Sequence, residues 1–265
     1  MKYLSFFKMC FSQGLQYRIS AIAGLATQFF WGLMMIFLYE AFYNNGISTP
    51  MEWPKLMSYI WLGQAFYGLI FFRIMNREIF DSIKTGQIAY EFVRPLNIYW
   101  MWFAKICGVR ASSCLLRLIP VIAFALLLPN PYNLGAPSSI GHFLLFIITL
   151  VFGLFISTAL NMLVYIIMFH TTSCKGIFNI FGNIADFLSG MDFPILFMPY
   201  IMQVVCMILP FRLCVDLPFR LYIGDISTME GLQTMCIQIV WIIVLVNVGQ
   251  RLMENVSKKV IVQGG

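Results

Sequence analysis

The sequence alternates between long apolar runs and short polar stretches, and the runs have the lengths of membrane-spanning helices. A helix needs about 20 apolar residues to cross a hydrocarbon core about 30 Å thick. The apolar runs give six candidate spans: residues 20–42, 56–72, 106–128, 143–169, 177–193 and 234–248. We therefore predict an all-α integral membrane protein with six transmembrane helices in a single domain over residues 1–265.

The first 19 residues predict a different kind of helix. At helical spacing, aromatic and aliphatic side chains line one face, and lysines and small polar residues line the other. The apolar face holds Tyr3, Phe7, Cys10, Phe11 and Leu15, and the polar face holds Lys2, Ser5, Lys8, Ser12 and Gln16. This pattern is typical of an amphipathic helix that lies flat in the membrane interface. The alternative for residues 1–19 is an irregular basic tail.

Two apolar runs are too long for one crossing. The first part of residues 95–128 carries Trp100, Trp102 and Lys105, so we expect it at the interface, with residues 106–128 in the membrane. The second long run, residues 177–211, needs another solution.

Residues 177–211 are interrupted by charges and prolines. The interruptions are Asp186, Asp192, Pro194, Pro199 and Pro210. They predict a fifth span that ends near Phe193, followed by one or two short helices that dip back into the outer leaflet. Non-helical backbone at that depth requires protein or water around it. Residues 194–231 would form this extracellular, re-entrant region.

The longest polar stretch is residues 76–97, within a predicted cytoplasmic segment over residues 73–97. A stretch this charged projects into water, because charges are costly in hydrocarbon. We expect the helix of the second span to continue beyond the membrane through Arg73 and Arg77. It would end at Gly86, since glycine tolerates a left-handed helix cap.

A short amphipathic element is expected after this helix end. It covers residues 87–93, with apolar side chains at Ile88, Phe92 and Val93. The pair Arg94-Pro95 closes it, because the residue before proline avoids helical geometry and proline suits a helix start. The element is either an ordinary solvated loop or a docking element for a soluble partner.

Composition and charge agree with a membrane protein and indicate its orientation. The chain is 60% hydrophobic and only 11% charged, whereas a soluble domain has about a quarter charged residues. The net charge of +6 is explained better by orientation than by binding of nucleic acid. With the amino terminus inside, most lysines and arginines also fall inside, and only Lys55, Arg212 and Arg220 fall outside. The positive-inside rule then places both termini and residues 76–97 in the cytoplasm.

Several kinds of chemistry have no motif in this sequence. The seven cysteines form no C-x-x-C pair and there are two histidines, so we predict no metal site. The phosphate-binding motif G-x-x-x-x-G-K-[ST] is absent, as are the H-E-x-x-H and G-x-S-x-G motifs. We therefore predict no catalytic residues in this chain.

The predicted spans contain a few charged residues. Arg110 is close enough to the membrane surface for its side chain to reach it. Arg117 is deeper, where an arginine costs about 2.5 to 3.5 kcal/mol on insertion. Either Arg117 is paired inside the bundle, with Asp186 as one candidate partner, or it faces a wet substrate path. The sequence does not separate these alternatives.

This layout resembles the permease subunits of the type 2 ABC exporter family. The resemblance rests on the amphipathic amino-terminal helix, the helix end at Gly86 followed by IAYEFVRPLN (residues 88–97), the proline-rich region before the last span, and the basic tail. It covers nearly the whole chain. Its most specific part is a pattern of three successive features: a glycine, a short helix with acidic and apolar residues, and the sequence R-P-L.

The resemblance implies partners and a site. Two copies of a separate ATP-binding subunit would bind ATP and Mg²⁺, and this chain would bind no cofactor. A second permease chain, the same or paralogous, would complete the complex in a bacterial cytoplasmic membrane, without nucleic acid. The first, second and fifth spans would line a path for a hydrophobic or amphipathic substrate such as a drug, antimicrobial peptide or lipid. The residues that dock the ATPase and couple it to the spans would be Gly86, Gln87, Ile88, Ala89, Tyr90, Glu91, Phe92, Arg94 and Pro95.

Two rival hypotheses belong to other classes. An ion-coupled secondary transporter would use Asp186 as its titrating acid and would work without ATP, because ion-coupled transporters usually need acids within the membrane. A membrane scaffold or membrane enzyme would also explain a charged cytoplasmic segment.

Overall fold

The computed structural model describes residues 2–16, 18–44, 49–88, 91, 96–171 and 173–258, with the side chains of residues 18–22 left outside the description. In these ranges every regular element is a helix, which confirms the all-α part of the predicted fold class. The elements are α1 (Lys2–Gln16), α2 (Arg18–Asn44), α3 (Trp53–Ile70), α4 (Arg77–Thr85), α6 (Ile98–Leu127), α7 (Ile140–Met168), α8 (Cys174–Ser189), η1 (Ile195–Phe197), α9 (Tyr200–Ile208), η2 (Pro210–Leu213), α10 (Asp216–Tyr222) and α11 (Thr228–Ser257).

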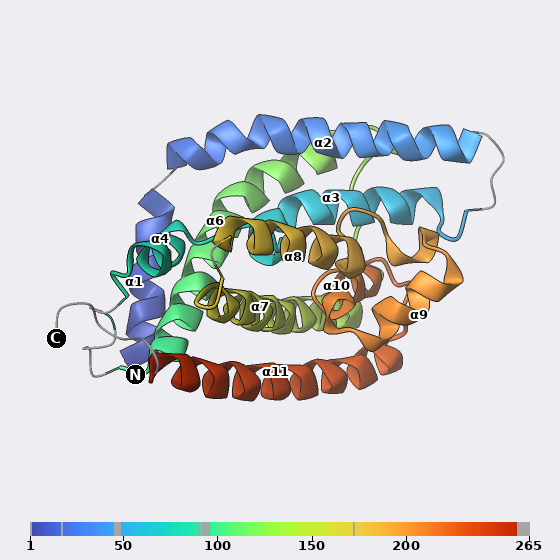
Figure 1. Ribbon diagram of the computed structural model, residues 1–265. Helices are drawn as coiled ribbons and strands as arrows, with labels where there is room; N and C mark the ends of the chain where they lie inside the picture. Colours follow the sequence, from blue (N-terminus) through green and yellow to red (C-terminus); the bar gives the residue numbers. More distant parts are fainter. Residues whose placement is uncertain are drawn as a thin grey trace.

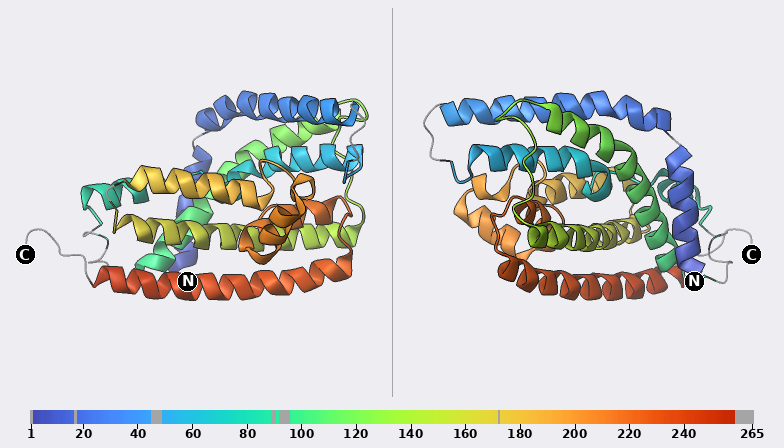
Figure 2. Two further views of the ribbon diagram at one scale, coloured as in Figure 1. Left: turned by 45° about the vertical axis from the view of Figure 1, so that its right-hand side comes forward. Right: turned by 180° about the vertical axis from the view of Figure 1, so that it is seen from behind.

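The long helices form a bundle with two different ends (Figure 1). The helix α1 lies across one end, where α4 and the last turns of α11 also lie, and we call this the α1 end. The short helices α9 and α10 lie at the opposite end, the α9 end (Figure 2). Helices α2, α6 and α8 leave the α1 end, and α3, α7 and α11 return to it. The chain order therefore follows the alternation that six successive spans would have.

Helix α1 packs directly on the first part of α6. The two backbones approach closely at Gly108, where an added Cβ would lie 2.8 Å from the Phe7 carbonyl oxygen. A second close approach lies one turn farther along, where an added Cβ on Gly14 would meet the Ser112 side chain. The predicted amino-terminal helix is present, and one of its faces packs against α6.

Helix α6 is one continuous helix of 30 residues, Ile98–Leu127. The helix runs without a break past residue 106, and the interfacial position of its first part stays a prediction. At a rise of 1.5 Å per residue the helix is about 45 Å long. It fits the bundle because it crosses obliquely, from the α1 end beside α11 toward α2 (Figure 1).

Helix α3 contradicts the prediction of a single helix from the second span to Gly86. It ends at Ile70, and Phe71, the residue that caps it, has an extended backbone (φ −65°, ψ 126°). A new helix, α4, begins at Arg77 after the Asn76 side chain caps its first turn by accepting from the Ile79 N–H. The predicted helix end at Gly86 is confirmed, with φ 75° in the left-handed region.

Short helices follow the fifth predicted span. Helix α8 ends at Ser189, and Gly190 caps it with φ 87°. The elements η1, α9, η2 and α10 then occupy residues 195–222, which confirms that the chain does not run on as one long helix. Their position relative to a lipid leaflet stays a prediction.

Four helices in the described ranges are long and apolar enough to cross a membrane: Ala23–Asn44 within α2, and all of α6, α7 and α11. Helices α3 and α8 fall short because α3 is less apolar and breaks after 18 residues, and α8 has 16 residues. The chain just after α3 meets the last turn of α8, where the Phe72 N–H donates to Asp186 Oδ1.

Candidate functional site

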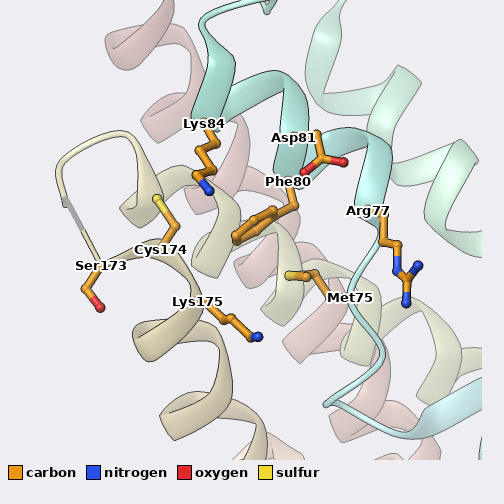
Figure 3. A pocket seen from close by; sticks show the side chains of 8 residues that line it. All are labelled: Met75, Arg77, Phe80, Asp81, Lys84, Ser173, Cys174 and Lys175. Carbon is orange, nitrogen blue, oxygen red and sulfur yellow. The ribbon is translucent and has the colours of Figure 1, made fainter.

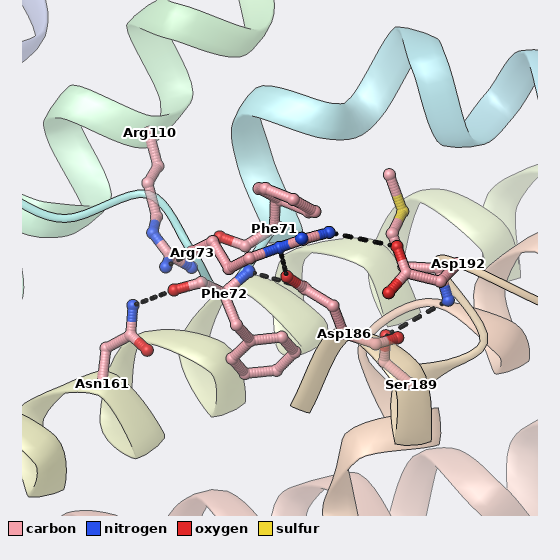
Figure 4. Close-up of polar contacts among 9 residues, drawn as sticks. Phe71, Phe72, Arg73, Arg110, Asn161, Asp186, Ser189 and Asp192 are labelled. Carbon is pink, nitrogen blue, oxygen red and sulfur yellow. Dashed lines mark hydrogen bonds and ion pairs between the residues drawn. The ribbon is translucent and has the colours of Figure 1, made fainter. Parts of the chain in front are cut away.

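The break after α3 exposes backbone groups inside the bundle, and polar side chains from three other helices bind them (Figure 4). Buried backbone N–H and C=O groups need partners, because leaving one unpaired costs several kcal/mol in hydrocarbon. The Phe72 N–H donates to Asp186 Oδ1 at 2.8 Å, and the Phe72 carbonyl accepts from Asn161 Nδ2 at 3.5 Å. The Asn76 N–H donates to the Tyr165 hydroxyl at 2.7 Å.

Arg110 provides the remaining contacts at the end of α3. Its two terminal nitrogens donate to the carbonyls of Leu69 and Phe71, and Nη1 also donates to Ser157 Oγ at 2.8 Å. The side chain is 2% exposed, so the expectation that it reaches the membrane surface is wrong. A cation at the carboxyl end of a helix is favourable because the last carbonyls carry partial negative charge.

An ion cluster joins the break to the end of α8. Arg73 Nε donates to Asp186 Oδ2 at 2.9 Å, and Arg73 Nη2 donates to Asp192 Oδ1 at 3.1 Å (Figure 4). The Asp186 side chain is fully buried, whereas those of Arg73 and Asp192 are about two-fifths and one-third exposed. Among the described residues, the ion-pair partner of Asp186 is therefore Arg73, and the suggested pairing with Arg117 is not formed.

A cavity of about 700 Å³ lies beside this cluster. Its walls come from α2, α3, α6 and the segment after α8, so it joins the first, second, third and fifth predicted spans. The lining residues are Gly24, Thr27, Gln28, Trp31, Met35, Gln64, Tyr67, Phe71, Arg73, Arg117, Met191 and Asp192. One part of the wall is charged and polar, and another is aromatic and aliphatic, which suits an amphipathic molecule.

Arg117 reaches this cavity from α6. An added Cβ on Gly24 would lie 3.1 Å from Arg117 Nη2, so the absence of a side chain there lets the guanidinium lie against α2. The Arg117 Nε is buried and has no hydrogen-bond partner in the described part of the chain. Arg117 thus lines the cavity, and whether this cavity is a substrate path stays a prediction.

The predicted docking segment begins at the α1 end. Ile88 is buried, and its N–H donates to the Ser82 carbonyl at 3.2 Å, so the chain folds back over α4 after Gly86. Glu91 Oε2 accepts from Trp102 Nε1 of α6. Gln87 follows Gly86 in the turn. The other predicted docking residues, Ala89, Tyr90, Phe92, Arg94 and Pro95, lie outside the described residues.

A cleft of about 670 Å³ opens beside α4, between this helix and the start of α8 (Figure 3). Met75 and Phe80 provide an apolar surface within it, and Lys84 and Lys175 face it from opposite sides. The full lining is Met75, Arg77, Phe80, Asp81, Lys84, Ser173, Cys174 and Lys175. The lining holds three cations and one carboxylate, so the cleft carries a net positive charge.

The comparisons with known proteins identify the family. The family model described as ABC-2 family transporter protein matches residues 29–264, which is most of the chain. The chain belongs to the ABC-2 transporter family. No match was found among curated proteins.

Membership of the ABC-2 family defines the general role of the chain. It is a multi-pass membrane protein and the permease component of an ABC transporter, and the component itself is not an ATPase. The family in general works with an ABC ATP-binding partner. This finding contradicts the ion-coupled secondary transporter, and the structure gives Asp186 a structural task instead, as the acceptor for the Phe72 N–H and for Arg73.

The sequence of this ABC-2 protein did not predict that Arg73 and Arg110 lie at the break after α3. Arg73 was assigned to the cytoplasmic surface because it follows a predicted span, and Arg110 was assigned to the membrane surface. The signal for Arg73 was present in the two aspartates of an otherwise apolar run, Asp186 and Asp192, which needed a cation nearby. Nothing in the sequence predicted that Arg110 would bind main-chain carbonyls.

Proposed function

We propose that this ABC-2 protein is the permease of an ATP-driven exporter in the bacterial cytoplasmic membrane. It would have six spans, both termini in the cytoplasm, and a re-entrant region in the outer leaflet at the α9 end. Two ATP-binding subunits and a second permease chain, identical or paralogous, would complete the complex. The substrate would be a hydrophobic or amphipathic molecule.

The observation that carries the proposal is the way the segment after α4 is attached to the spans. Helix α4 is tied to α6 by the ion pair of Glu78 with Lys105, and the segment beyond Gly86 is tied to α6 by Glu91 and Trp102. A subunit that binds this segment and moves would therefore pull on α6. Because α6 also holds the end of α3 through Arg110, the same movement would reach the Arg73 and Asp186 cluster.

The cleft beside α4 extends this docking surface. Its apolar residues, Met75 and Phe80, would receive an apolar side chain of the ATP-binding subunit, and Arg77, Lys84 and Lys175 would bind its carboxylates. Charge complementarity of this kind orients a partner and speeds its association. The site would therefore combine an apolar anchor with a basic rim.

The experiment changes the charge of the docking segment. Glu91→Lys and Arg94→Glu are each expected to leave membrane insertion intact and to uncouple ATP hydrolysis from transport. Glu91→Gln, which keeps an acceptor for the Trp102 N–H, is expected to retain more activity than Glu91→Lys. Glu254→Lys, an exposed charge reversal on α11 at the same end, is the matched control. Unchanged transport in both Glu91→Lys and Arg94→Glu would refute the assignment of the coupling site.

A further inference from the structure

Among the residues that the structure describes, the cavity between α2, α3 and α6 contains an arginine without an ionic partner. Arg73 is engaged by two carboxylates, and Asp186 and Asp192 are engaged by Arg73. Arg117 forms no ion pair within the described ranges, and its Nε is buried and unpartnered. The charge in this cavity that is free to bind a ligand is therefore positive. Arg117 as a whole is only partly buried, but a buried N–H donor such as its Nε is costly unless a hydrogen-bond acceptor meets it.

The shape of the cavity separates this charge from an apolar surface. Along α2 the lining runs from Gly24 to Met35, about 17 Å at the helical rise of 1.5 Å per residue. Arg117 lies against Gly24 at one end of this length. The side chains of Trp31 and Met35 lie two to three turns farther along. Trp31 is 47% exposed, so the cavity opens toward the surface of the bundle.

The geometry points to a ligand with an anionic head and an apolar tail. The carboxylate or phosphate would accept hydrogen bonds from the Arg117 guanidinium, which binds such groups with two parallel N–H donors. The tail would lie along α2 against Trp31 and Met35. This inference rests on the proposed function, because it names the chemical class of the substrate that the permease would accept.

Photolabelling tests this assignment on the full-length protein in phosphatidylcholine nanodiscs. The probe is a fatty acid that carries a diazirine in its chain, and the comparison probe is the amine of the same length and diazirine position. Labelled peptides are located by mass spectrometry. We expect the acid to label residues 24–35 and the amine to label them at least about tenfold less, the factor that 1.4 kcal/mol represents.

Variants of Arg117 connect the labelling to the guanidinium. Arg117→Gln is expected to reduce labelling of residues 24–35 by the acid at least about tenfold, since a hydrogen bond to a charged group is worth about 1.5 to 3 kcal/mol. Arg117→Lys keeps the charge, serves as the second variant in case Arg117→Gln does not fold, and is expected to retain part of the labelling. Arg251→Gln, at an exposed position on α11, is the matched control and should leave labelling unchanged.

The source of the anionic ligand is distinguished by adding phosphatidylglycerol to the nanodiscs. Competition with the acid would identify a membrane lipid as the occupant, whereas no competition would indicate a different anionic amphiphile. Equal labelling by acid and amine, stronger labelling by the amine, or labelling that Arg117→Gln leaves intact would overturn the inference. The assay needs no ATP-binding subunit. If the labelling gives one of these results while the ATP-binding subunit still binds this chain, the proposed function stands.

Discussion

Replacing Asp186 tests whether the ion cluster holds the end of α3 in place. Asp186→Ala removes a charged acceptor from the Phe72 N–H at 2.8 Å, a contact worth about 1.5 to 3 kcal/mol. It also leaves Arg73 with only the partly exposed Asp192, a pair worth about 1 kcal/mol or less. We expect the free energy of unfolding to fall by about 3 to 5 kcal/mol, the range for breaking a buried pair.

Asp186→Asn separates the hydrogen bond from the charge. Its amide oxygen still accepts from the Phe72 N–H, so the expected loss is about 2 kcal/mol. Asp192→Asn is the matched control, and because that side chain is about one-third exposed we expect a loss below about 1 kcal/mol. The assay is reversible unfolding in mixed detergent and dodecyl sulfate micelles, followed by far-ultraviolet circular dichroism.

A double-mutant cycle with Arg73→Gln makes the test specific. We expect the losses from Asp186→Asn and Arg73→Gln to differ from additivity by about 1 to 3 kcal/mol, since the two residues are in direct contact. Additive losses, or an Asp186→Asn variant as unstable as Asp186→Ala, would refute the reasoning.

Three further predictions concern other contacts. Gly108→Ala would place a Cβ 2.8 Å from a backbone oxygen of α1, so we expect α1 to loosen and the buried Cys10 to become reactive to maleimide. Gly86→Ala meets no atom within 4 Å, so its cost is the left-handed backbone alone, about 1 kcal/mol in thermal unfolding. Gln238→Leu removes donations at 2.9 and 2.8 Å to carbonyls of α7 and η2, and should cost about 1 to 3 kcal/mol in the same assay.

Each of these predictions has a contrary result. Unchanged labelling of Cys10 in Gly108→Ala would mean that α1 does not depend on the close approach to α6. A loss well above about 2 kcal/mol for Gly86→Ala would mean that the turn carries contacts beyond its backbone geometry. A Gln238→Leu protein as stable as the parent would mean that α7 and η2 are held together without that side chain.

Much of the fold could be predicted because the apolar runs report directly on helices that face lipid or the bundle interior. The predicted amino-terminal helix, the helix end at Gly86 and the short helices after Gly190 were found for physical reasons visible in the sequence. Glycine permits the left-handed caps, and prolines prevent a long continuous helix.

The break in α3 could not be predicted, because its cause lies outside the segment. Residues 70–76 contain no proline or glycine, so local preference allows a continuous helix. The helical hydrogen bonds are replaced by contacts from Arg110, Asn161 and Asp186, which come from three other helices. The same contacts decide that Asp186 pairs with Arg73 and leave Arg117 for the cavity. The contacts from these three helices outweigh the local preference for a continuous helix.

For the docking segment, in contrast to the break in α3, the sequence predicted several features. Its position, its start at Gly86 and its polarity followed from the sequence, and Ile88 and Glu91 are seen to bind back onto the protein. Which subunit binds it could not be read from residue types, since a solvated loop has the same composition. Family membership supplies the general partner, and the docking assignment stays a proposal.

The most direct test of the central claim is co-purification of an ATP-binding subunit in mild detergent. The intact chain is compared with one in which Gln87–Arg94 is replaced by a Gly/Ser linker, and gel filtration verifies that both remain folded. We predict that an ABC ATP-binding subunit purifies with the intact chain and is lost from the linker variant. An intact, folded chain that purifies without this subunit, or a linker variant that retains it fully, would contradict the account.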